Sequence, residues 1–280
     1  MAIGDSTRIN SNIAAQNALL SLKTIGRGLE RSQLKLATGL RINEVADDPA
    51  GFVISRRLMA RSRGLVVAYD NVGTVKNVLA IAEGGLMNIS DILVTIKEKV
   101  TSAANDTWWS AERHAIKTEI NQLTSEIDNI VTETTFNNIT LLNGTYSVSY
   151  QTGAGTTDVL HFAITQSAEV TSLEVDSGNV SSMIFTAEGA SNALGKVNTA
   201  IETISDMLQK IGATVARLTV KESMLSTAIT NTDATVSRIM DADIAMEQLK
   251  TTRFQILQQT STAQLAQANV MPFSTLALFL

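Results

Sequence analysis

Two histidines, His114 and His161, could supply an imidazole to catalysis or to a metal ion. His114 is followed by Ala115, so its surroundings do not form the His-Glu-x-x-His zinc motif. His161 lies in an alternating, strand-like stretch, where a packing or surface role is expected. The chain has no cysteine, which excludes disulfides, thiolate catalysis and cysteine-based zinc sites. The sequence therefore predicts neither a metal site nor a catalytic triad.

Asp47 and Asp48 are adjacent carboxylates, which could bind a metal or act in acid catalysis if a third group lay nearby. Pro49 follows them, and proline is favoured at the first position of a helix, where its missing N–H costs nothing. Asp48 is then well placed as the N-cap of a helix that begins at Pro49. Asp241 and Asp243 have the same expected role before the last helix. We predict capping in preference to metal binding.

Trp108 and Trp109 are the two tryptophans of the chain and stand next to each other. Such a pair could stack on a sugar. The favoured interpretation is a hydrophobic staple at the junction between two helices, since the residues around 105–107 interrupt a long helical pattern.

The net charge of −5 gives no reason to expect a nucleic-acid partner. A local basic cluster consists of Arg56, Arg57, Arg61 and Arg63. It is interpreted as a solvated helix face, with a phosphate or lipid site as the alternative. Residues 1–23 lack the basic and apolar regions of a cleaved signal, and no run approaches the ~20 apolar residues of a membrane span. We expect no cofactor, no membrane partner and no enzymatic activity.

Residues at alternating steps of three and four form two long seams that are apolar except at Arg61, Glu222 and Thr232. The first seam comprises Leu58, Arg61, Leu65, Ala68, Val72, Val75, Leu79, Ala82, Leu86, Ile89, Leu93, Ile96, Val100 and Ala103. The second comprises Leu194, Val197, Ile201, Ile204, Leu208, Ile211, Val215, Leu218, Glu222, Leu225, Ile229, Thr232, Val236 and Ile239. A helix from about 50 to 106 would span roughly 85 Å at ~1.5 Å per residue, so the helices must form a rod and bury their seams against each other.

The pattern changes at Asn143, where an alternating stretch, a glycine-rich turn and a second apolar stretch predict a β-hairpin within 143–185. A third strand is expected near 173–175. The predicted fold class is mainly α: an elongated, antiparallel, coiled-coil-like helical bundle with a small central β-hairpin region. The terminal helices carry little apolar area, so we expect them to be ordered mainly in an assembly.

Motifs at both ends of the chain resemble one protein family. LATGLRINEVADDPAGFVISRRL, residues 36–58, resembles the N-terminal signature of bacterial flagellins, and FQILQQTSTAQLAQANVMP, residues 254–272, resembles their C-terminal signature. The resemblance covers about 1–142 and 186–280. The short 143–185 segment indicates a minimal form without large outer domains.

The resemblance implies three domains: an inner coiled-coil domain (1–45 and 236–280), a helical rod domain (46–142 and 186–235), and the β-hairpin segment of the rod (143–185). It implies a secreted, extracellular subunit that polymerises with itself into the flagellar filament for swimming motility. Type III export with a chaperone at the C-terminal segment is implied too, together with filament cap and hook-junction proteins as partners. The expected self-assembly residues are Leu22, Ile25, Leu29, Ile256, Leu257 and Leu265.

One departure from the family concerns the segment that a vertebrate innate receptor recognises in many flagellins. There an arginine and a leucine are replaced by Thr95 and Lys99, while Glu98 and Glu119 match. The resemblance then implies weak or absent receptor activation.

Three other interpretations are weighed against a filament subunit. A hook–filament junction protein shares flagellin-like ends, but resembles the C-terminal signature less well. A coiled-coil signalling rod would need a membrane span or an output hairpin, and neither is visible in the sequence. A metalloprotease insert, as some flagellins carry, would not fit in 143–185, which also has no His-Glu-x-x-His motif.

Overall fold

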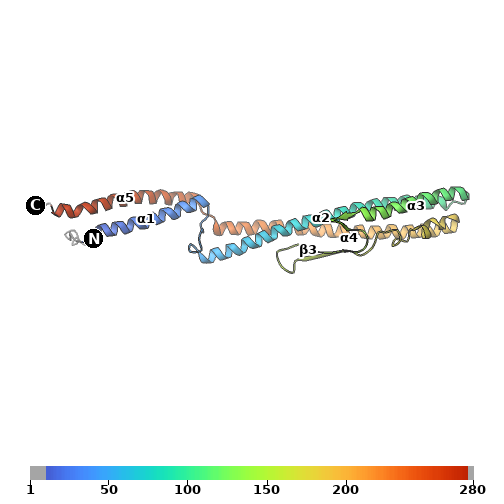
Figure 1. Ribbon diagram of the computed structural model, residues 1–280, viewed down its shortest axis with the longest axis horizontal. Helices are drawn as coiled ribbons and strands as arrows, with labels where there is room; N and C mark the ends of the chain where they lie inside the picture. The colour runs from blue at the N-terminus through green and yellow to red at the C-terminus, as the bar shows by residue number, and fades with distance from the viewer. Residues whose placement is uncertain (1–10, 277–280) are drawn as a thin grey trace. The chain divides into compact units, whose positions relative to one another are not determined.

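The structure, a computed structural model, describes the backbone of residues 11–276 and the side-chain surroundings up to residue 273. The described residues form five α-helices, two antiparallel two-stranded sheets and two short helical turns (Figure 1). In chain order these are α1 (Ile13–Thr38), α2 (Pro49–Ala103), α3 (Ser110–Glu133), β1 (Thr135–Phe136), β2 (Ile139–Thr140), β3 (Tyr146–Gln151), β4 (Val159–Ile164), η1 (Ser177–Ser181), η2 (Met183–Phe185), α4 (Ala187–Met240) and α5 (Ile244–Leu276). The mainly helical fold class, with long antiparallel helices and a small hairpin, is confirmed.

The chain divides into two compact units: Met1–Ala60 with Asn231–Leu280, and Arg61–Thr230. We call them the terminal unit and the central unit. The sequence places the corresponding boundaries at 45/46 and 235/236. Parts of the predicted inner domain, residues 1–10 and 277–280, lie outside the described residues.

The terminal unit pairs α1 with α5, the two ends of the chain, as antiparallel helices (Figure 1). α1 ends because Gly39 adopts the left-handed conformation, with a φ of 72°, and its N–H donates to the Lys35 carbonyl oxygen at 2.9 Å. A residue with a Cβ is strained in that conformation, so glycine is the favoured helix terminator there. α1 therefore ends at a defined residue, and the chain continues as a loop before α2.

The central unit has one apolar core, shared by α2, α3, α4, β3 and β4. Twelve consecutive positions of the predicted α2 seam, from Leu65 to Ala103, are all buried. The α4 seam alternates between buried and half-buried positions, such as Val197 and Ile201. Both helices also have exposed apolar positions outside these seams, such as Met87 of α2 and Val220 of α4, and they run alongside each other in the central unit (Figure 1).

α2 is the one helix of the described chain long and apolar enough to pass a test for membrane spans, with an 18-residue window of mean hydropathy 1.5. The expectation from the sequence concerned an unbroken apolar run, which this test does not require, because its window tolerates up to two charged residues. α2 passes because its seam forms the core of the central unit, and a buried core helix has the same composition as a spanning one.

Glu222, a polar exception in the α4 seam, pairs with Lys76 of α2. The two side chains meet with Nζ 2.8 Å from Oε2, and this hydrogen bond holds the pKa of the Glu222 carboxyl below its ordinary value of 4.5, against a smaller opposing effect of desolvation. Because the pKa is lower in the folded than in the unfolded chain, the pair stabilises the fold above pH 4.5, and this stabilisation is lost as pH falls through the folded pKa.

We therefore expect Glu222→Gln to lower the urea midpoint of unfolding slightly at neutral pH, and this difference from the parent to vanish in acid. Circular dichroism across a pH series measures it. Glu202→Gln, at an exposed position of the same helix, is the matched control and should change little at any pH. A Glu222→Gln effect of the same size in acid would contradict the assignment.

The predicted hairpin is confirmed as β3 and β4, which pair from Tyr146 opposite Ile164 to Gln151 opposite Val159. The third strand expected near 173–175 is wrong. Glu174 has a φ of 56°, which interrupts an extended chain, and this stretch forms a turn instead. The small β1–β2 hairpin was not predicted, although its turn residues Asn137 and Asn138 both have positive φ, which asparagine tolerates well.

Candidate assembly surface

A row of close contacts joins α1 to α5. The Phe254 ring lies so near Gly28 that a Cβ added there would be 2.8 Å from it, which favours glycine at this crossing. One helical turn further along α1, Ser32 is buried, and its hydroxyl donates to Glu247 Oε1 at 2.8 Å, while Thr251 donates to Ser32. The contact between α1 and α5 is thus close at Gly28 and polar at Ser32.

Glu247 is 7% exposed and lies in this seam. Desolvation by burial would raise the pKa of its carboxyl, but hydrogen bonds from Lys250 and Ser32 outweigh it, so the pKa lies below the ordinary value. Lys250 Nζ lies 2.9 Å from Glu247 Oε2. A charged carboxylate is therefore accommodated inside the pair because it is hydrogen-bonded and has a neighbouring cation.

The structure places the expected assembly residues in two different environments. Leu22, Ile25, Leu29, Leu257 and Leu265 are half-buried on the two paired helices. Part of the apolar area of these five side chains is therefore already removed from solvent within a single chain. Ile256 differs, since it is 56% exposed.

Ile256 belongs to an exposed row on α5, which we call the outer stripe: Leu249, Ile256, Ala263 and Val270. These residues recur every seventh position, so they share one face of the helix. The stripe lies on a different face from Phe254, Ser261 and Ala268, which are partly or fully buried. Leu249 is 67% and Val270 58% exposed. α5 thus has two faces with apolar residues, and α1 covers one of them.

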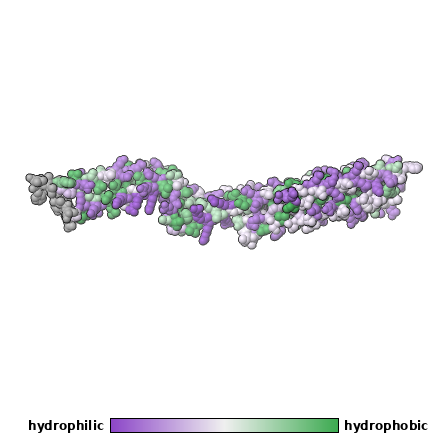
Figure 2. Space-filling model, in the orientation of Figure 1, coloured by the Kyte–Doolittle hydropathy of each residue, from purple (hydrophilic) through white to green (hydrophobic). Residues whose placement is uncertain are grey.

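The sequence analysis missed the outer stripe except for Ile256. The signal that could have found it was the unbroken seven-residue recurrence of apolar residues from Leu249. α1 adds exposed leucines, Leu19, Leu20 and Leu34. Figure 2 shows apolar residues intermixed with polar ones on the visible surface of α1 and α5, in place of a uniformly polar exterior.

The loop between α1 and α2 is tied to the chain between α4 and α5 by backbone hydrogen bonds. The Arg41 N–H donates to the Met240 carbonyl oxygen at 2.6 Å, and the Ala242 N–H donates to that of Gly39 at 2.9 Å. The Arg41 guanidinium also donates to the carbonyl oxygen of Ile239. The Gly-Leu-Arg-Ile-Asn motif therefore fastens the α1–α2 loop to the end of α4 and the α4–α5 connection.

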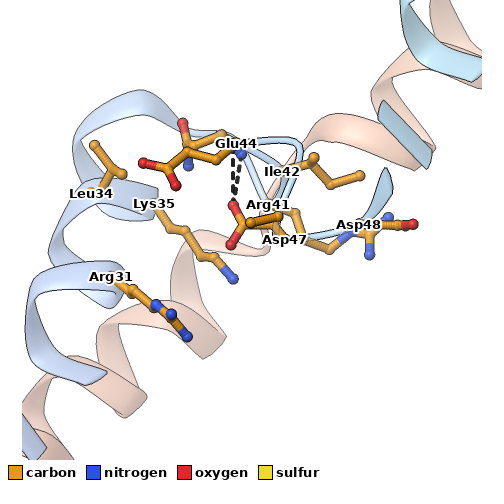
Figure 3. A pocket seen from close by; sticks show the side chains of 10 residues that line it. Arg31, Leu34, Lys35, Arg41, Ile42, Glu44, Asp47 and Asp48 are labelled. Atoms are coloured by element: carbon orange, nitrogen blue, oxygen red, sulfur yellow. Dashed lines mark hydrogen bonds between the residues drawn. The ribbon is translucent and has the colours of Figure 1, made fainter. Parts of the chain in front are cut away.

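The same loop borders an open cavity of about 380 Å³ (Figure 3). Asp47 Oδ2 accepts hydrogen bonds from the backbone N–H groups of Asn43 and Glu44, at 3.1 and 3.2 Å. These bonds are the main reason that the pKa of Asp47 is lowered, and Lys35 and Arg31 on α1 add to the effect. Asp47 thus shapes the loop.

The aspartates before α2 and α5 make local hydrogen bonds. Asp48 Oδ1 accepts from the Gly51 N–H at 2.9 Å, and α2 begins at Pro49. Asp243 Oδ1 accepts from the Met246 N–H at 3.1 Å before α5. Asp241 does not cap α5, because its carboxylate accepts from the Ser237 hydroxyl within the end of α4.

The residues of the innate-receptor segment lie on α2 and α3. Lys99 Nζ is 2.6 Å from Glu119 Oε1, so these two side chains form an ion pair. The Thr95 hydroxyl donates to the Asp91 carbonyl oxygen within α2, and Glu98 is exposed. The surface that this segment presents is therefore polar.

The predicted hydrophobic staple at Trp108 and Trp109 is wrong. Trp109 is 80% and Trp108 41% exposed, because the loop turns both side chains away from the core. His114 packs against the ring of Phe185, and His161 shares a hydrogen bond with Ser149 across the β3–β4 hairpin. Within residues 11–276, no group of three or more His, Asp or Glu side chains could hold a metal ion.

Two sequence families match the chain, one from each end. The bacterial flagellin N-terminal helical region matches residues 9–147, and the bacterial flagellin C-terminal helical region matches residues 194–279. Together they span well over half of the chain. The chain belongs to the bacterial flagellin family.

Individual flagellins match the chain over nearly its whole length. Flagellin of Bacillus subtilis (strain 168) is 34% identical over 97% of this chain and 99% of its own length. A flagellar filament core protein of Brachyspira hyodysenteriae is 32% identical over 94% of this chain and 96% of its own. The near-complete coverage on both sides is consistent with a flagellin that lacks a large outer domain.

A solved structure of a protein assigned as flagellar hook-associated, from Vibrio parahaemolyticus, matches with a TM-score of 0.60. The match covers 70% of this chain and 100% of that one, at 14% identity. At this identity the likeness shows a shared fold alone. A protein assigned to another part of the flagellum therefore has a similar helical architecture.

Proposed function

We propose that the chain is a structural subunit that polymerises with itself into the extracellular flagellar filament and so serves swimming motility. The observation that carries this proposal is the outer stripe of α5, an apolar face that a single chain leaves in water. A second helix from another subunit is the simplest cover for such a seven-residue repeat. Contacts between non-identical surfaces do not close, so repeated docking extends a filament.

We further propose that the chain is not an enzyme, because the family to which it belongs consists of structural proteins. Its proposed partners are an export chaperone that binds the C-terminal segment, the filament cap and hook-junction proteins. The chaperone proposal fits α5 physically, since the outer stripe would otherwise stay exposed before assembly. Family membership leaves no support for the signalling-rod alternative.

Electron microscopy after salt-induced polymerisation of the purified full-length chain tests the function. We expect long, uniform filaments that return to monomers on mild heating. Monomers under every condition would contradict self-polymerisation. They would favour the alternative of a hook–filament junction protein, for which the shared fold is the supporting observation.

Truncation tests the role of the terminal unit. Deleting residues 1–30 or 260–280 removes part of α1 or α5 and should leave a soluble, helical central unit that cannot polymerise, since the central core lies wholly within residues 61–230. Sedimentation and circular dichroism measure the two properties. Normal filaments from either truncated chain would contradict the proposal.

The innate-receptor segment gives a separate prediction. We propose weak or absent receptor activation, because Thr95 replaces the arginine and Lys99 is paired with Glu119. A reporter-cell assay should show a response far below that of an agonist flagellin. The double change Thr95→Arg and Lys99→Leu should raise it, and activation by the parent at agonist level would contradict the proposal.

A further inference from the structure

The loop between α2 and α3 exposes two adjacent tryptophan side chains to solvent. Trp109 is 80% exposed, a larger fraction than any other large apolar side chain described, and Trp108 beside it is 41% exposed. Two acidic side chains flank the pair: Asp106, whose side chain is 86% exposed and lies 3.6 Å from the Arg113 guanidinium in an ion pair, and Glu112, which is also exposed. We call these four residues the tip surface.

The tip surface sits on a loop that is already ordered. Arg113 is 5% exposed, and its guanidinium donates to three carbonyl oxygens, those of Asn105, Trp108 and Ile184, at 2.9 to 3.3 Å. This ties the loop to the turn before α4. A partner that docks on the tryptophans therefore has little loop entropy to overcome, which favours binding.

A complementary surface lies at the opposite end of the same unit. The first turns of α2 within the central unit carry the exposed side chains Arg63, Val66 and Val67 on one face of the helix, with Val67 59% exposed. We call them the basal segment. About 40 helical residues separate the basal segment from the tip surface, which is roughly 60 Å at ~1.5 Å per residue. One central unit cannot bring its own two ends together, so a contact between them must join two subunits.

The chemistry of the two surfaces matches. A guanidinium group stacks on tryptophan faces more favourably than on other aromatic rings, and the charge of Arg63 is opposite to that of Glu112 at the tip. Val66 and Val67 provide an apolar surface against which the indole rings can pack. Tryptophan and arginine together are the residues most often found to dominate the free energy of an interface.

We propose that the tip surface of one subunit docks on the basal segment of the next, with Trp109 as the central contact. The contact joins two different surfaces of one chain, so it propagates head to tail and does not close. It rests on the proposed function, because it requires that subunits polymerise, and it adds a specific contact made by the central unit.

Intrinsic fluorescence tests the contact directly, since Trp108 and Trp109 are the only tryptophans in the chain. On polymerisation of the full-length protein we expect the emission to move to shorter wavelength and quenching by acrylamide to fall several-fold, with both changes reversed on heating. Filaments seen by electron microscopy whose tryptophans remain equally quenchable would overturn the contact and leave the filament function intact. An absence of filaments would overturn the proposed function, and the contact with it.

Substitutions supply the second test. Trp109→Ser should raise the critical concentration for polymerisation about tenfold or more, as expected for the loss of a central interface residue. Met87→Ser, at a 55% exposed position of α2 outside both surfaces, is the matched control and should leave it unchanged. Circular dichroism checks that both variants keep the parental helix content.

Charge reversal tests the pairing of the two surfaces. The change Arg63→Glu should impair polymerisation, and adding Glu112→Lys should partly restore it. Restoration distinguishes a contact between these surfaces from a general effect of charge. Unaltered polymerisation by Arg63→Glu, or by Trp109→Ser, would overturn the proposal.

Discussion

Replacing Leu249 and Ile256 with aspartate is expected to abolish polymerisation while leaving the chain folded. Both side chains are more than half exposed in the single chain, at 67% and 56%, so the helix pair does not need them. We propose that a neighbour buries the outer stripe in the filament, and an unpaired carboxylate at such a buried site costs several kcal/mol. Two such changes should prevent filaments at concentrations on the order of a hundredfold above the parental threshold.

The matched control is Gln255→Asp with Thr262→Asp, which adds the same charge to exposed positions of α5 outside the stripe. It should polymerise nearly as the parent does. Sedimentation gives the critical concentration, and circular dichroism gives the helix content. Equal impairment of both double variants would show that added charge alone is responsible, and the outer stripe would lose its assigned role.

The fold of the central unit follows from its sequence because burial there is periodic. The three- and four-residue steps from Leu65 to Ala103 predict the face of α2 that the structure buries. The hairpin of β3 and β4 follows from alternation and a glycine-rich turn. The predicted third strand failed because one residue, Glu174, takes a left-handed conformation, and no residue type there announces it.

The assembly surface was harder to predict, because α5 has apolar residues on more than one face. Leu257 and Leu265 fit a helical seam in the sequence as well as Leu249 and Ile256 do, and the sequence does not say which face the chain covers itself. Only the pairing of α1 with α5 separates them. The exposure of Trp109 could not be predicted from the sequence either. Arg113 holds the loop through backbone carbonyl oxygens, which every residue type has, so no sequence pattern indicates these bonds.

Truncating Ile89 to alanine should lower the free energy of unfolding of the central unit by about 2–5 kcal/mol, as for other large aliphatic side chains in tightly packed cores. Ile89 is fully buried in the middle of the α2 seam, with Leu86 and Leu93 buried on either side. Neighbouring helices cannot collapse into the space, because the same seam holds them apart along its length. Urea unfolding followed by circular dichroism measures the change.

Met87→Ala is the matched control, because Met87 lies two residues away on the same helix and is 55% exposed. It removes a side chain of similar size, yet should change the unfolding free energy by no more than about 0.5 kcal/mol. Helix propensity favours alanine in both variants. The difference between their unfolding free energies therefore reports the effect of burial in the seam. Equal losses would mean that the α2 seam does not form the core that stabilises the central unit.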